Sequence, residues 1–101
     1  MLESVYESVL AYELKKRGLT IDRQVPVPVV YDDLRFEEGF RADLIVDKAV
    51  VVELKSVEIL APVHSKQLLT YMKLLDYRLG LLLNFGSPIL KDGIKRIVNH
   101  L

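Results

Sequence analysis

Apolar side chains recur along this chain with two different periods, one typical of helices and one of strands. They return at helical spacing over residues 2–17, and Gly18 is suited to end that helix. They do so again over residues 63–76, after the break at Ala61-Pro62. The apolar stripe of the first predicted helix is Leu2, Val5, Tyr6, Val9, Leu10 and Leu14, and that of the second is Leu68, Leu69, Met72 and Leu75.

Strands are predicted where Val, Ile and Leu alternate with other residues or follow one another in short runs. The predicted strands are residues 20–31, a short returning strand at 34–37, then 39–46, 50–57 and 78–85. The tail IKRIVNHL could be a strand or a short helix, and its weak alternation favours a strand. Pro26 and Pro28 remove backbone donors from the first of these, which should therefore be an edge strand or a kinked one. The order of elements predicts an α/β fold with a central sheet flanked by helices.

The register of the central hairpin follows from its apolar positions. If the loop is Asp47-Lys48-Ala49, Val46 pairs with Val50, and one face is wholly apolar. That face would carry Ala42, Leu44 and Val46 against Val50, Val52 and Leu54. The other face would set Asp43 opposite Glu53, and Arg41 opposite Lys55. A two-residue turn would move Asp43 to the apolar side, so the pattern favours the longer loop.

Length and composition bound the class of protein. The chain has 101 residues, which suits a single domain over residues 1–101, and half of them are hydrophobic, enough to bury a core. The formal net charge is zero, which argues against a protein that simply coats nucleic acid.

Several kinds of site and location are excluded or disfavoured. The absence of cysteine excludes disulfides, thiolate metal sites and cysteine nucleophiles. The longest uncharged apolar run, Leu79 to Phe85, is far shorter than the ~20 residues of a membrane helix. The start of the chain has acids where a secretion signal needs positive charge, so we expect a cytoplasmic protein. Neither a phosphate-binding glycine loop nor a serine-hydrolase motif occurs.

The candidate chemistry lies on the two central strands. Glu53 and Lys55 project from the same face of one strand, and the register brings Asp43 beside Glu53. Two carboxylates at cross-strand distance repel each other unless a cation lies between them, and Mg²⁺ or Mn²⁺ prefers such oxygen ligands. Lys55 could then orient a water molecule or stabilise charge on a phosphate. The alternatives are an ordinary solvated face, or a partly buried salt bridge from Glu53 to Lys55 or Arg41.

The pattern of Asp43 followed by Glu53-Leu54-Lys55 resembles the PD-(D/E)XK nuclease superfamily. Nearly the whole chain resembles one branch of it, the small GxxExxY proteins: Glu3 and Tyr6 match that motif, and its glycine would fall one residue before Met1. The stretches RADLIV, VVELKSV, PVHSKQLLTYMKL and LLNFG also look like this branch.

The resemblance implies a restriction-endonuclease-like core with a mixed sheet, and a Mg²⁺- or Mn²⁺-dependent nuclease that acts on nucleic acid, by expectation DNA, through a metal-activated water. It implies that Asp43, Glu53 and the backbone carbonyl of Leu54 are metal ligands and that Lys55 acts on the attacking water. Glu3 resembles an additional helix acid that completes or positions the catalytic site. Gln67 and Tyr71 resemble a Q-x-x-x-Y pair that holds phosphate or the lysine, and their i, i+4 spacing places them on one helix face. From spacing alone, Tyr71 would be a core residue and Gln67 a solvated one.

Two further functions remain open at this stage. The chain could be a non-catalytic module that binds nucleic acid or protein and retains the nuclease fold. It could also form a homodimer through apolar surface, particularly if a helical segment that usually precedes this domain is missing. Calorimetry with Mn²⁺ separates the first alternative from a nuclease, and light scattering tests the second.

Overall fold

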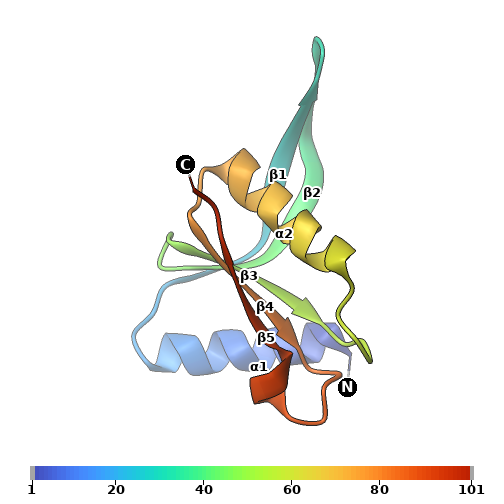
Figure 1. Cartoon of the computed structure of the whole chain (residues 1–101). Coiled ribbons are helices and arrows are strands. Elements are labelled where there is room, and N and C mark those ends of the chain that lie inside the picture. Colours follow the sequence, from blue (N-terminus) through green and yellow to red (C-terminus); the bar gives the residue numbers. More distant parts are fainter. Residues whose placement is uncertain (1, 101) are drawn as a thin grey trace.

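Five strands form one mixed sheet in the order β1-β2-β3-β4-β5 in the computed structural model, which describes residues 2–100 (Figure 1). The elements are α1 (Glu3–Lys16), β1 (Ile21–Tyr31), β2 (Leu34–Val46), β3 (Val50–Lys55), α2 (Pro62–Leu75), β4 (Leu79–Asn84), a 3₁₀ turn η1 (Leu90–Gly93) and β5 (Ile94–Val98). β3 and β4 are parallel and joined by α2, and the other neighbours are antiparallel. This α/β architecture confirms the predicted central sheet flanked by helices.

The two helices pack on opposite faces of the sheet, and the strands pass between them in Figure 1. Residues of α2 share a core cluster with Val27, Ala42, Ile45, Val51 and Leu82. The α1 residue Ala11 packs with Leu44, Val52, Leu54 and Leu83. β3 is therefore buried on both faces, which explains its unbroken Val-rich sequence. Among residues 2–100, neither helix is long and apolar enough to cross a membrane.

The hairpin register predicted from the sequence is confirmed. Val46 pairs with Val50 and Leu44 with Val52, so the loop is Asp47-Lys48-Ala49. Oδ1 of Asp47 accepts hydrogen bonds from both the amide N–H and the hydroxyl of Thr20, which ties this loop to the start of β1. The last strand, β5, and the edge position of β1 are also as predicted.

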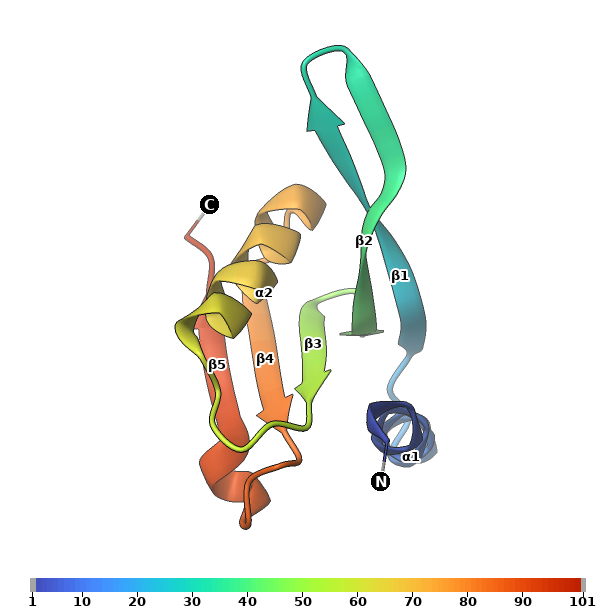
Figure 2. The same cartoon turned by 90° about the vertical axis from the view of Figure 1, so that its right-hand side faces the viewer.

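The first two strands form a long arm, and here one prediction is wrong. Residues 34–37 and 39–46 are not separate strands but parts of the continuous strand β2. Its far half pairs only with β1 and projects beyond the sheet as a two-stranded arm, residues 28–39 (Figures 1 and 2). The strand stays continuous because Gly39, where pairing shifts, has no Cβ and lets the Val29 side chain approach the backbone closely.

The apolar stripe predicted for the first helix is only partly buried. Leu10 and Leu14 pack toward the sheet, as does Tyr6, whose ring stacks on Phe85 with centroids 4.2 Å apart. Leu2, Val5 and Val9 are instead exposed, because the helix turns Glu7 and Ala11 toward the sheet. α1 thus carries apolar side chains on its outer face as well as its inner one.

Candidate active site

The backbone ladder between β2 and β3 ends where two carboxylates begin to replace it. Backbone pairing runs from Val46 and Val50 to Leu44 and Val52 and then stops. Beyond it, the amide N–H of Asp43 donates to Oε1 of Glu53 at 2.9 Å, and the amide N–H of Leu54 donates to Oδ2 of Asp43 at 2.8 Å. A backbone N–H of each strand therefore donates to a carboxylate of the other strand. The predicted proximity of Asp43 and Glu53 is confirmed.

The same split changes which face Ala42 occupies. Strict alternation predicts that Ala42 and Leu44 share one face, but Ala42 packs in the α2-side cluster and Leu44 in the α1-side cluster. The prediction for Ala42 is wrong because β2 departs from a regular ladder at Asp43.

The opposite neighbour of Asp43 is irregular too. On β1, Arg23 pairs with Leu44 and Val25 with Ala42, which leaves Gln24 across from Asp43 with no pairing of its own. Gln24 has a φ of 50°, a left-handed conformation that costs a residue with a side chain about 1 kcal/mol or more. Asp43 thus lies between two interruptions of the sheet, one on each neighbouring strand.

Burial makes it costly for both carboxylates to be ionised. Only 5% of Glu53 is exposed, and burial, followed by the charge of Asp43, raises its pKa to about 8. Burial also raises the pKa of Asp43, and the charge of Glu7 adds to this effect, while the hydrogen bond from Leu54 opposes it. A cation bound between the two groups would stabilise their charged forms.

Lys55 follows Glu53 by two residues at the end of β3, beside the carboxylate pair. Its positive charge lowers the pKa of both Asp43 and Glu53. It does not form a salt bridge with either: among residues 2–100, the ion pairs include neither carboxylate. Pairing of β2 with β3 ends before Arg41 and Lys55, so the predicted pairing of these two residues is wrong. Arg41 instead forms an ion pair with Glu38, and the alternative of a salt bridge from Glu53 to Lys55 or Arg41 is wrong as well.

A small cavity of about 120 Å³ adjoins Asp43 on the α1 side of the sheet. It is lined by Glu3, Ser4, Glu7, Gln24, Asp43 and Leu54. The structure therefore brings Glu3, predicted from the resemblance, to the same cavity as Asp43. Glu3 itself is exposed in the first turn of the helix.

Glu7 is the buried acid of this cavity and was missed from the sequence. It is 5% exposed, accepts a hydrogen bond from Nε2 of Gln24 at 2.9 Å and pairs with Arg23 at 3.5 Å. Its sequence signal is its spacing: it precedes Leu10 and Ala11 by three and four residues, so it occupies a position on the buried stripe. Gln24 gives no such signal, because its role depends on the bend in β1.

On the α2 side, Tyr71 approaches the carboxylate pair. It is 5% exposed, and burial, followed by the charges of Glu53 and Asp43, raises its pKa to about 12, so its hydroxyl remains protonated at neutral pH. Gln67 lies one turn earlier and lines an open groove together with Tyr71 and Lys55. His64 lies in the first turn of α2, where its Nδ1 accepts a hydrogen bond from the Ala61 amide at 3.0 Å.

Comparison with models of protein families shows that residues 1–97 match the PD-(D/E)XK nuclease superfamily. The chain belongs to this superfamily. Neither the curated proteins nor the solved structures gave a significant match.

Membership of the PD-(D/E)XK superfamily bears on both the fold and the chemistry of the carboxylate pair. The fold is consistent with the restriction-endonuclease-like core of this superfamily, whose members are nucleases that generally use divalent metal ions and act on nucleic acid. Within residues 2–100, no three His, Asp or Glu side chains form a metal-binding group. A metal between the two strands would meet two carboxylates, those of Asp43 and Glu53. Mg²⁺ fits such a set because it usually keeps several waters and binds through one or two carboxylates.

Proposed function

We propose that this chain is a metal-dependent nuclease that hydrolyses phosphodiester bonds of nucleic acid, DNA in preference to RNA. The observation that carries the proposal is a pair of carboxylates, the partly buried Asp43 and the buried Glu53, held between β2 and β3 beside Lys55. Isolated, such a pair is unfavourable, so its presence at the centre of the sheet supports a cation-binding role. The small GxxExxY branch is the subgroup we propose, on Glu3 and Tyr6.

Each residue has a role that follows from its position. Asp43, Glu53 and the Leu54 carbonyl would hold Mg²⁺ or Mn²⁺, which when bound lowers the pKa of water and stabilises negative charge on phosphate. The ammonium of Lys55 would orient the attacking water or stabilise charge developing on the phosphate. The hydroxyl of Tyr71 and the amide of Gln67 would hold the phosphate or Lys55 from α2. Glu3 and Glu7 would position the site from α1.

The proposal is tested by replacing one carboxylate with an amide of the same shape. Glu53→Gln keeps an oxygen that can accept the Asp43 N–H, so the fold should survive, as checked by circular dichroism. We expect it to lose Mn²⁺ binding in calorimetry and at least about 100-fold of the cleavage rate on a DNA substrate. The matched control is Glu37→Gln, which removes an exposed acid from the arm and should leave both unchanged.

Equal cleavage by wild type and Glu53→Gln would refute these roles. Absence of Mn²⁺ binding by the wild type at millimolar metal would instead favour a non-catalytic binding module with the nuclease fold.

A homodimer is also supported by one surface, the outer stripe of α1, defined as Leu2, Val5, Val9 and Tyr12. A two-fold axis centred between Val5 and Val9 would pair Val5 with Val9 and Leu2 with Tyr12 of a second, antiparallel copy. The same arrangement brings Glu3 toward the partner's basic end, Lys15 and Lys16. Apolar residues would thus meet apolar residues, and acidic would face basic, across a two-fold axis.

A further inference from the structure

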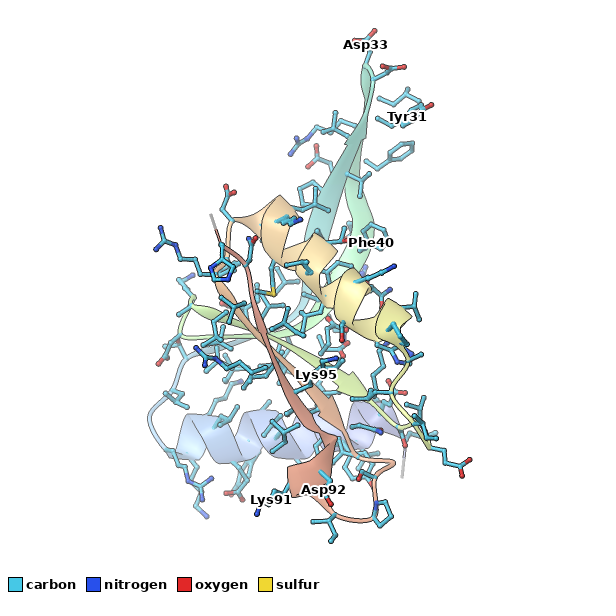
Figure 3. All side chains as sticks on the ribbon, viewed as in Figure 1. Tyr31, Asp33, Phe40, Lys91, Asp92 and Lys95 are labelled. Carbon is cyan, nitrogen blue, oxygen red and sulfur yellow. The ribbon has the colours of Figure 1, made fainter. Side chains whose placement is uncertain are left out.

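An open groove of about 540 Å³ runs along α2 beside the carboxylate pair. It is lined by Phe40 of β2, by Lys55 at the end of β3 and by residues of α2 between Val63 and Tyr71. Figure 3 shows Phe40 at the base of the arm, next to α2, and Tyr31 near the arm's tip. Three residues of the candidate site, Lys55, Gln67 and Tyr71, therefore line the same groove as the ring of Phe40.

The charges of the groove are of one sign. Lys55 and Lys66 line it, and among the described residues that do so there is no Asp or Glu, although the chain as a whole is neutral. The arm beyond Phe40 instead carries Glu37 and Glu38, each paired with an arginine. A phosphate backbone would thus be attracted along α2 rather than along the arm.

Phe40 has the properties of a platform on which a flat ring can stack. Its ring packs against Tyr71 with centroids 5.2 Å apart and an interplanar angle of 45°, and Tyr71 is itself 5% exposed. Phe40 nevertheless keeps 38% of its surface exposed, and it lines the groove. It precedes Asp43 by three residues on one strand, which places it about 10 Å from the carboxylate pair along β2.

We propose that this groove binds a single strand of nucleic acid, with one unpaired base stacked on Phe40 and phosphates on Lys55 and Lys66. The inference rests on the proposed nuclease function and specifies its substrate as single-stranded or frayed nucleic acid. Bases inside a duplex have no free face, so an aromatic ring in this groove can stack on one only after the strand is unpaired.

The test compares binding of one oligonucleotide, labelled with 2-aminopurine, as a single strand and within a hairpin duplex. Binding is measured in EDTA so that no cleavage proceeds. We expect the single strand to bind at least about tenfold more tightly and its fluorescence to be quenched by stacking. Phe40→Leu, which keeps apolar packing on Tyr71, should lose about tenfold in single-strand affinity and the quench. Phe36→Ala, on the exposed arm, is the matched control and should change neither.

Equal affinity for the duplex, or an unchanged quench in Phe40→Leu, would overturn the inference. The native chain's cleavage with Mn²⁺ is measured separately, so the two proposals can fail independently. Cleavage of duplex without preference for single strands would overturn this inference and leave the nuclease proposal standing. Stacking of a single strand without cleavage of any substrate would support this inference and refute the nuclease.

Discussion

Asp43 and Glu53 are joined by a direct hydrogen bond from the amide N–H of the first to Oε1 of the second, 2.9 Å long. Oδ2 of Asp43 in turn accepts the amide N–H that follows Glu53, that of Leu54, at 2.8 Å. The two carboxyl groups therefore do two things at once: they replace ladder hydrogen bonds of the sheet, and they place two acidic side chains next to each other. Substitutions at these positions separate the two effects.

Two variants of Asp43 measure how much its hydrogen bond to the Leu54 amide contributes to stability. Asp43→Asn keeps an oxygen for the Leu54 N–H, whereas Asp43→Ala leaves that part-buried donor without a partner. We expect Asp43→Ala to be less stable than Asp43→Asn by about 1–3 kcal/mol in urea unfolding without metal. Both should lose Mn²⁺ binding. Equal stability of the two variants would show that the hydrogen bond contributes nothing measurable.

The pH dependence of stability follows from the raised pKa of Glu53. In the folded, metal-free chain its pKa is about 8, against an ordinary value of 4.5, so the folded state binds a proton that the unfolded state releases. The free energy of unfolding should therefore fall as the pH rises from about 4.5 to 8, by up to about 1.4 kcal/mol per pH unit.

Urea unfolding in EDTA at several pH values measures this slope. Glu53→Gln should flatten it, because the glutamine cannot titrate. Mn²⁺ should oppose the loss at high pH, since it binds the ionised pair. A slope of the opposite sign in the wild type would contradict the raised pKa.

The two acids of α1 at the site, Glu3 and Glu7, should contribute unequally to Mn²⁺ binding and cleavage. Glu7 is buried, hydrogen-bonded to Gln24 and close enough for its charge to raise the pKa of Asp43, whereas Glu3 is exposed. We expect Glu7→Gln to change Mn²⁺ affinity or cleavage rate by about tenfold or more, and Glu3→Gln by less. Cleavage kinetics and calorimetry on the two variants decide the order, and a larger effect at Glu3 would reverse the assignment.

Two substitutions of Gln24 separate the role of its side-chain amide from the cost of its left-handed backbone. Glycine adopts a φ of 50° without cost, so Gln24→Gly removes the amide and relieves strain, while Gln24→Ala removes only the amide. We expect Gln24→Gly to be more stable than Gln24→Ala by about 1 kcal/mol in thermal unfolding. If the amide positions Glu7, both variants should lose similar amounts of activity despite their different stabilities.

The proposed dimer depends on the outer stripe of α1. Val9→Glu places a charge at its centre and should convert any dimer to monomer, as measured by light scattering over a range of concentrations. Leu74→Glu alters an equally apolar, exposed position on α2 and serves as the control. A chain that is already monomeric at high concentration would refute the dimer.

Local patterns in the sequence predicted much of the fold because burial and hydrogen bonding act over short stretches. The Val-rich run of β3, the prolines of β1 and the requirement that Val46 face Val50 set the elements, the edge strand and the hairpin register. That register also predicted the contact between Asp43 and Glu53. The continuity of β2 was missed because it involves a close contact between Gly39 and Val29. These residues lie on two different strands, so their contact depends on how the strands pair and not on the local sequence around either one.

The sequence by itself thus determined the α/β class, the hairpin register and the acid pair with its lysine, since a two-residue period fixes which side chains meet across a hairpin. Only the tertiary structure decided that Glu7 is the helix acid buried beside Asp43, and that the left-handed backbone of Gln24 lets its side chain bind Glu7. It also decided that the ring of Phe40 packs against Tyr71. These contacts join residues on separate elements. Their geometry depends on how helices and strands pack together, which no local period in the sequence specifies.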